Sequence, residues 1–217
     1  NRQLVYQKLL EFDIPCPDFV VVDHKACQPN GLAVFQEFDN YIVYNGRRID
    51  KPVVEKPIDG DDHNIWIHYP KSRGGGCKKL FRKVGNKSAQ YDPKINRVRT
   101  DKAYIYEPYM TTGGTDVKVY TVGETYFHAE ARKAPTVDGN VKRSKDGKET
   151  RYPIILAEFE KMFAAVVVRA FGMQVCGFDI LRTNKGSLVC DVNGWSFVKG
   201  STKYYNDSAV LLRRFFL

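Results

Sequence analysis

The chain has 217 residues, 43% of them hydrophobic, which is enough for one sizeable core or two small ones. Its 34 Lys and Arg residues outnumber its 25 Asp and Glu residues, and the net charge of +9 predicts affinity for polyanions without choosing among nucleic acid, anionic lipid and polyphosphate. No apolar run reaches the roughly 18–20 residues of a membrane span, and five cysteines without C-x-x-C spacing argue against disulfide or zinc frameworks, so we expect a reducing, cytosolic setting.

Short strands dominate the first part of the chain. Hydrophobic periodicity predicts a helix over residues 2–12 and strands at 19–22, 41–44, 53–56, 65–69, 79–84, 103–107, 116–122 and 126–132, whereas residues 23–40 follow no clear period. The Asn45-Gly46 turn is expected between the strands 41–44 and 53–56.

The strongest helix signal comes later, at residues 155–171, where apolar side chains share one face and Gly172 follows as a C-terminal cap. The remaining elements are a long polar loop or hairpin at 138–150, a hairpin of strands 175–181 and 188–192, and a last helix from about Asp207. Mostly antiparallel strands with inserted helices indicate an α+β fold. Because the chain opens inside an amphipathic run and stops on an apolar helix face, we expect one catalytic module of a longer protein.

A pair of acids in the predicted hairpin indicates a metal site. If the hairpin is centred on Lys185, Asp179 lies opposite Asp191, and Asn193 shares the face of Asp191. Two opposed carboxylates repel each other, and with an amide oxygen they form a hard-oxygen set suited to Mg²⁺. The alternative is that both acids are solvated or paired with nearby lysines.

Several segments have the composition of a nucleotide site. Lys56 ends an apolar strand, and the Gly74-Gly75-Gly76 loop offers backbone N–H groups that phosphates can approach closely. With Arg82 and Lys83, this loop is interpreted as a flap over a triphosphate. The segment Tyr104–Met110 is a candidate adenine hinge, although this segment taken alone favours an ordinary edge strand.

These segments, taken in order, resemble the ATP-grasp kinase domain of the diphosphoinositol pentakisphosphate kinases of the Vip type. The matching strings are Val54-Glu55-Lys56-Pro57, Asp62-His63-Asn64, Gly74-Gly75-Gly76, Leu80-Phe81-Arg82-Lys83, Gly114–Tyr120, His128–Lys133, Cys176–Asp179, Cys190–Gly194 and Ser196–Lys199. The resemblance implies an ATP-grasp fold in which two α+β lobes clamp ATP. The lobes would span about 20–108, and about 1–19 with 109–217.

The resemblance also implies the chemistry and its residues. The γ-phosphoryl of ATP would pass to the 1-phosphate of inositol hexakisphosphate or 5-diphosphoinositol pentakisphosphate, with two Mg²⁺ ions expected. By motif position, Asp179, Asp191 and Asn193 bind Mg²⁺; Arg2, Lys56, His63 and Lys118 meet the ATP phosphates; Glu107 and Met110 lie at adenine and Asp116 at the ribose; Arg82, Lys83, Arg132, Arg143, Arg151, Ser196 and Lys199 surround the inositol phosphate. His63, Arg132 and Lys118 would act directly on the transferring phosphoryl group.

Members of this family carry a preceding small α/β domain and a following phosphatase-like domain, and neither is expected in this chain, which we expect to be monomeric. Pro108 departs from the acidic residue common at its position. The partner expected is a small inositol polyphosphate, with no nucleic acid.

Three rival functions are a nucleic-acid-binding domain, an ATP-grasp carboxylate–amine ligase, and a module that binds inositol phosphates without turnover. The acid pair argues against the first rival, since it would repel a phosphate backbone, and the dense basic residues argue against the second.

Overall fold

The computed structural model describes residues 1–27 and 34–217, which form two compact units. Unit 1 comprises residues 1–4, 17–114 and 134–149, and unit 2 comprises residues 5–16, 115–133 and 150–217. Within these residues, unit 1 has two sheets and unit 2 has one, and each unit has its own hydrophobic core. None of the helices described is long and apolar enough to cross a membrane.

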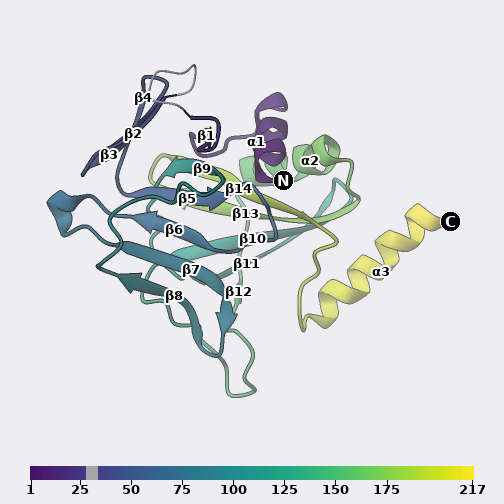
Figure 1. Ribbon diagram of the computed structural model, residues 1–217. Helices are drawn as coiled ribbons and strands as arrows, with labels where there is room; N and C mark the ends of the chain where they lie inside the picture. The colour runs from purple at the N-terminus through teal and green to yellow at the C-terminus, as the bar shows by residue number, and fades with distance from the viewer. Residues whose placement is uncertain (28–33) are drawn as a thin grey trace. The chain divides into compact units, whose positions relative to one another are not determined.

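Unit 1 is built on a six-stranded antiparallel sheet in the order β1-β9-β5-β6-β7-β8, with a separate three-stranded sheet β2-β3-β4 (Figure 1). The strands are β1 (Val20–Asp23), β2 (Phe35–Glu37), β3 (Tyr41–Tyr44), β4 (Arg47–Asp50), β5 (Val53–Pro57), β6 (Ile65–His68), β7 (Cys77–Val84), β8 (Lys87–Asp92) and β9 (Ala103–Pro108), and a 3₁₀ turn η1 (Lys71–Arg73) precedes β7. The core joins the two sheets, because Ile42 and Ile49 pack with Val53, Tyr104 and Tyr106.

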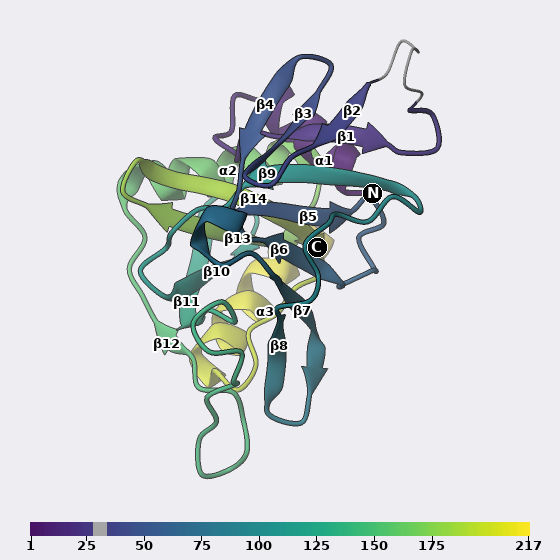
Figure 2. The same ribbon diagram turned by 60° about the vertical axis from the view of Figure 1, so that its left-hand side comes forward.

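Unit 2 contains a five-stranded antiparallel sheet in the order β12-β11-β10-β13-β14. Its strands are β10 (Thr115–Val122), β11 (Tyr126–Lys133), β12 (Tyr152–Pro153), β13 (Val175–Thr183) and β14 (Gly186–Gly194); its helices are α2 (Glu158–Phe171), α3 (Thr202–Phe216) and the larger part of α1 (Arg2–Glu11). One face of the sheet packs on α1 and α2 in a core that includes Leu9, Val119, Val167 and Phe178. Figures 1 and 2 both show α1 beside α2.

The structure corrects several expected boundaries. The Asn45-Gly46 turn connects β3 to β4, and β5 belongs to the other sheet, so the expectation that this turn lies between strands 41–44 and 53–56 misses one strand. The strand β8 was also not predicted. The last helix begins at Thr202 rather than near Asp207, because the Ser201 side chain caps it by accepting from Tyr204 N–H at 3.2 Å.

Helix α2 begins later than the apolar period suggests. The Glu160 carboxylate accepts the N–H of Ala157 at 2.9 Å and so closes the first turn after residues 155–157. Gly172 ends the helix in the left-handed conformation, at φ 61°, as predicted.

Candidate functional site

The sheet of unit 2 has one polar face, opposite the face that packs on α2. Successive side chains of a strand point to opposite faces, so the residues paired with Lys118 and its second neighbours share this face. We call the following residues the polar face: Asp116, Lys118 and Tyr120 of β10; His128, Glu130 and Arg132 of β11; Asp179 of β13; Asp191 and Asn193 of β14. Four paired positions form a row of charges across it, namely Asp191, Asp179, Lys118 and Glu130.

The predicted opposition of Asp179 and Asp191 is confirmed, but by a different route. The hairpin pairs Thr183 with Gly186, a register that by itself would place Asp179 opposite Cys190. A bulge between Asp179 and Ile180, at which Cys190 is the extra residue of β14, shifts the pairing by one residue, so that Asp179 lies opposite Asp191. The bulge therefore re-aims the carboxylate, as bulges near functional sites often do.

Each acid has a neighbour on the polar face. Lys118 Nζ lies 3.2 Å from Asp179 Oδ1, and Asn193 Nδ2 donates to Asp191 Oδ2 at 2.8 Å. Over the described ranges, no three His, Cys, Asp or Glu residues gather as a metal cluster. The side-chain oxygens of Asp179, Asp191 and Asn193 nevertheless suit a hard cation. Mg²⁺ is such a cation, and it commonly takes its remaining ligands from water and substrate phosphates. Lys118 and the two carboxylates together carry a net charge of −1, which a bound cation would offset.

Two candidate substrate arginines have carboxylate neighbours on this face. Arg132 Nη2 lies 3.6 Å from Asp116 Oδ2, its partner across the β10–β11 ladder. Arg151 Nη1 donates to the Tyr120 hydroxyl at 2.7 Å and lies 3.5 Å from Glu130 Oε2. Burial raises the pKa of Tyr120 to about 12, so this hydroxyl stays protonated near neutral pH. The resemblance assigns Asp116 to the ribose and Arg132 to the acceptor, whereas in this structure the two side chains form an ion pair with each other.

Lys56 and Glu107 form a buried ion pair in unit 1. Lys56 Nζ lies 2.8 Å from Glu107 Oε1, and both side chains are almost fully buried. The strand that carries Glu107 is interior to the sheet, since β9 pairs with both β1 and β5, so the edge-strand alternative for residues 104–107 is wrong. Past Pro108, Tyr109 N–H donates to Pro52 O at 2.9 Å, and Met110 lies half-buried outside any strand.

The glycine triplet has a structural explanation. Gly74, Gly75 and Gly76 all have positive φ, and their N–H groups donate to Lys71 O, Pro70 O and the Asn96 side chain. A Cβ on Gly76 would lie 2.2 Å from the Tyr91 hydroxyl. The expectation that these N–H groups face a phosphate is therefore wrong for this structure, in which all three are already used.

Arg2 has a similar explanation. Its guanidinium is buried, with 7% of the residue exposed, and donates to the carbonyls of Pro57, Asp59, Gly60 and Asp62 at 2.6–3.3 Å. These carbonyls belong to the segment that leads to His63, which is itself exposed. Arg2 thus orders the loop that carries a candidate phosphate ligand.

The other predicted substrate residues are exposed, except Ser196, which is half-buried. In unit 1, Arg143 donates to Asn86 Oδ1 and Gly85 O, Lys83 pairs with Glu149, and Arg82 is exposed. In unit 2, Ser196 packs on Gly177, where a Cβ would lie 2.5 Å away, and Lys199 is exposed.

Comparison with known proteins places this architecture in a family. The profile of the RimK-like ATP-grasp domain matches residues 88–210. The chain belongs to the RimK-like ATP-grasp family. A solved ATP-grasp ligase, PsnB bound to a precursor variant, Mg and ADP, superposes with a TM-score of 0.55 at 13% identity, over 98% of this chain and 58% of that one. D-alanine–D-alanine ligase from Bacillus anthracis superposes with a TM-score of 0.52 at 14% identity, over 98% and 64%. At such identities these structures show the fold alone.

Sequence relatives of this ATP-grasp chain are much closer. It is 54% identical over 99% of its length to the inositol hexakisphosphate and diphosphoinositol-pentakisphosphate kinase VIP1 of Arabidopsis thaliana. The identity is 57% over 98% of its length to the kinase of the same description in Caenorhabditis elegans, and 50% over 98% to kinase 2 of Homo sapiens. The chain spans 20%, 16% and 17% of the lengths of these three relatives.

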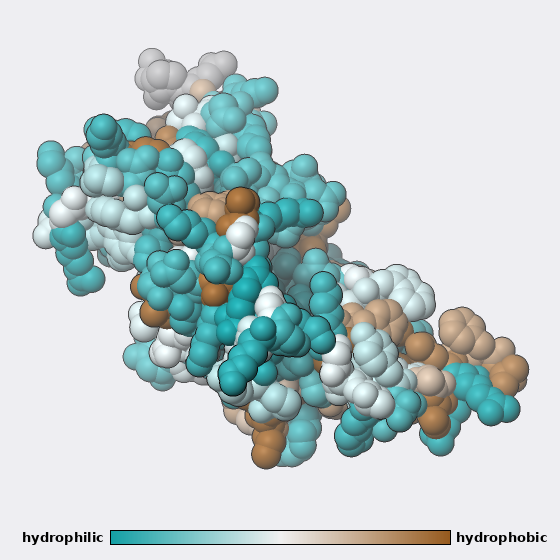
Figure 3. Space-filling model, turned by 90° about the horizontal axis from the view of Figure 1, so that it is seen from below, coloured by the Kyte–Doolittle hydropathy of each residue, from teal (hydrophilic) through white to brown (hydrophobic). Residues whose placement is uncertain are grey.

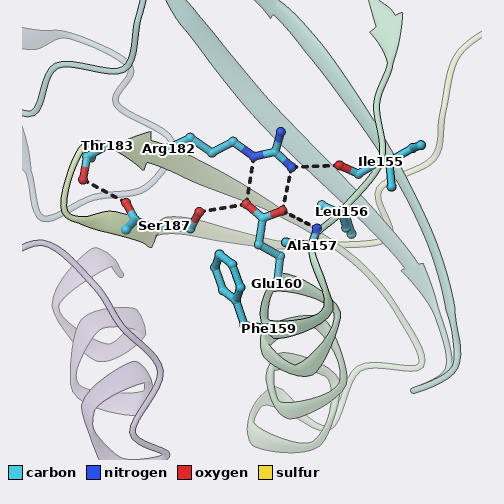
Figure 4. A pocket seen from close by; sticks show the side chains of 9 residues that line it. Ile155, Leu156, Ala157, Phe159, Glu160, Arg182, Thr183 and Ser187 are labelled. Carbon is cyan, nitrogen blue, oxygen red and sulfur yellow. Dashed lines mark hydrogen bonds and ion pairs between the residues drawn. The ribbon is translucent and has the colours of Figure 1, made fainter.

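Unit 2 also has a pocket of about 470 Å³ at the start of α2 and the tip of the β13–β14 hairpin (Figure 4). Its floor is the buried carboxylate of Glu160, which accepts from Arg182 Nε at 2.8 Å, Arg182 Nη2 at 2.6 Å and the Ser187 hydroxyl at 2.7 Å. None of the predicted site residues lines it. Because the charged groups in this pocket pair with each other, we interpret them as a structural link between the start of α2 and the β13–β14 hairpin of the ATP-grasp chain.

The sequence interpretation missed Tyr120 and Glu130, which share the polar face with the predicted residues. The signal was available, because each lies two positions from a predicted residue on the same strand, Lys118 and Arg132 respectively. Farther along the chain, α3 exposes Val210, Phe215 and Phe216, and Figure 3 shows hydrophobic side chains gathered over this helix at the right of the view.

Proposed function

We propose that this ATP-grasp chain carries the phosphoryl-transfer site of an inositol polyphosphate kinase. The reaction moves the γ-phosphoryl of Mg-ATP to the 1-phosphate of inositol hexakisphosphate or 5-diphosphoinositol pentakisphosphate and forms a pyrophosphate. The support is the identity of 50–57% to proteins with that description, over almost the whole chain.

The observation that carries the proposal is the facing pair Asp179 and Asp191, with Lys118 beside it. Asp179, Asp191 and Asn193 would hold Mg²⁺, which supplies positive charge to the phosphates in transfer. Whether one or two ions are held is part of this proposal. An acceptor phosphate is already anionic near neutral pH, so the site needs charge and positioning rather than a strong base.

The remaining roles follow the family motifs. Lys56, His63 and Lys118 would contact the ATP phosphates, Glu107 and Met110 the adenine, and Asp116 the ribose. By the same motif positions, Arg82, Lys83, Arg132, Arg143, Arg151, Ser196 and Lys199 would bind the inositol phosphate, because arginine forks match phosphate oxygens. Arg2 acts through the loop that it orders.

The decisive experiment is Asp191→Asn in the full protein. This change keeps the size of the side chain and removes one of the two facing charges. We expect Mg²⁺-dependent turnover of inositol hexakisphosphate, followed by ³¹P NMR for a new β-phosphate resonance, to fall by at least about 100-fold.

The matched control is Glu124→Gln, which neutralises an exposed carboxylate of the same unit that pairs with Arg169. It should leave turnover intact. Full activity of Asp191→Asn would remove Asp191 from the metal site.

A carboxylate–amine ligase is the second candidate, because the superposed solved structures include ligases. A ligase releases inorganic phosphate and ADP only with a carboxylate and an amine present. ADP formation that depends on those substrates, with no β-phosphate resonance from inositol phosphates, would replace the kinase proposal.

A further inference from the structure

Glu130 is a nearly buried carboxylate whose own contacts are poor. The residue is 8% exposed, and its two oxygens lie 3.5 Å from His128 Nε2 and 3.5 Å from Arg151 Nη1. Among the described residues, neither Glu130 Oε2 nor His128 Nε2 has a hydrogen-bond partner. A buried carboxylate without good hydrogen bonds is costly, so its presence calls for a role other than stability.

The position of Glu130 indicates that role. It stands at the end of the charged row, paired across the ladder with Lys118, and at ion-pair distance from Arg151. Arg151 is therefore held from two directions by polar-face residues, through the Tyr120 hydroxyl at 2.7 Å and the Glu130 carboxylate at 3.5 Å. Tyr120 is itself fixed, since it is buried and packs against the Tyr204 ring, with centroids 6.2 Å apart.

We propose that Glu130 and Tyr120 are positioning residues that hold the Arg151 guanidinium at the polar face, ready to bind a phosphate of the acceptor. Arg151 follows the polar loop 138–150 and has a long side chain that would otherwise lose rotational freedom on binding. Fixing it in advance removes that entropic cost, which is about 0.5–1.5 kcal/mol for an ordered side chain at an interface. This proposal rests on the proposed function, because it assumes that Arg151 meets the acceptor.

Two roles of the Glu130 charge predict opposite changes in the KM for the acceptor, so a measurement of this KM distinguishes them. If Glu130 only faces the substrate, its charge repels a polyanion, and neutralising it lowers the KM for the acceptor. If it positions Arg151, neutralising it loosens that arginine, and the KM rises.

The first test is Glu130→Gln in the full protein, with the KM for inositol hexakisphosphate and the KM for ATP measured separately. We expect the acceptor KM to rise by up to roughly tenfold, which corresponds to the upper end of the cost of ordering one long side chain, and the ATP KM to stay within about twofold. Glu124→Gln is the control and should change neither value. An acceptor KM that falls, or equal rises in both KM values, would overturn the proposal.

A double-mutant cycle separates positioning from a general structural effect. In the variant Arg151→Ala, Glu130 has no guanidinium to hold, so adding Glu130→Gln should change the acceptor KM by less than about twofold. Tyr120→Phe should behave in the same way. Additive effects of Glu130→Gln and Arg151→Ala would show that Glu130 acts independently of Arg151.

A third measurement does not depend on turnover. In arginine-labelled protein, NMR reports how fast the Arg151 guanidinium rotates about its Nε–Cζ bond, with the resonance assigned through Arg151→Lys. Rotation should be slow in the unmodified protein and in Glu124→Gln, and faster in Glu130→Gln. Unchanged rotation would refute positioning. If the unmodified protein phosphorylated no inositol phosphate, the proposed function would fail, and this measurement would still decide whether Glu130 holds Arg151.

Discussion

At the scale of the residue, several side chains of this protein serve the backbone rather than a ligand. Arg2 is the clearest case, since one buried guanidinium donates to four carbonyls between Pro57 and Asp62. The carbonyl groups converge on one guanidinium. A loop without regular secondary structure needs such a donor, because its buried carbonyls have no partners in a helix or sheet. The loop in turn presents His63 at the surface.

Arg2→Lys tests this role. A lysine keeps the charge but cannot reach four carbonyls with one ammonium group, so we expect the free energy of unfolding to fall by about 2 kcal/mol. Urea denaturation measures it. Arg48→Lys is the control, because Arg48 is exposed and bonds Asp50 at the surface. Unchanged stability together with a raised KM for ATP would instead place Arg2 on the nucleotide.

At the scale of the element, Glu160 joins the start of α2 to the β13–β14 hairpin that carries the acid pair. The residue is 1% exposed and accepts from Ala157 N–H, the Arg182 fork and the Ser187 hydroxyl. Burial pushes the pKa of Glu160 up, but these donors outweigh burial and hold the pKa below its ordinary value. The hairpin thus has a fixed anchor at its turn end, opposite its acidic end.

Glu160→Gln should lower the free energy of unfolding by about 2 kcal/mol at pH 7, since it replaces the charge-assisted hydrogen bonds from Arg182 with weaker ones. A depressed pKa contributes stability above the pKa of the unfolded state, and this contribution disappears as the pH falls through the folded value. The difference between the two proteins should therefore shrink below about pH 4.5. Glu158→Gln, on the exposed side of the same helical turn, should differ little from the unmodified protein. A loss that is constant down to pH 3 would contradict the electrostatic origin.

At the scale of the whole molecule, the chain carries a net charge of +9, and its polar face holds charges of both signs. The polar face combines acids, which need a cation, with arginines, which suit phosphate oxygens. A chain of this charge attracts a polyanion over distances that salt shortens, because the Debye length falls from about 30 Å at 0.01 M to about 8 Å at 0.15 M.

Salt dependence should accordingly distinguish the two proposed substrates. Inositol hexakisphosphate carries more charge than Mg-ATP, so raising KCl from 50 to 300 mM should increase its KM several-fold more than the KM for ATP. Initial rates across the salt range measure both values. Parallel changes would show that the long-range field does not select the acceptor.

The sequence by itself determined the α+β class, most strand positions and the shared face of Asp191 and Asn193 on their strand. These follow from alternation within a strand and from helical periodicity, which are local properties. It also contained the family strings, which indicated the ATP-grasp fold.

Only the tertiary structure showed which polar groups are already hydrogen-bonded within the chain. It showed that the glycine triplet and Arg2 bond their own chain, that β3 pairs with β4, and that a bulge brings Asp191 into register. It also brought Glu130, Tyr120 and Arg151 together. The physical reason is that the periodicity of the sequence determines which face of a helix or strand carries a side chain. The contact partner of that side chain depends instead on hydrogen bonds and packing between residues far apart in the chain.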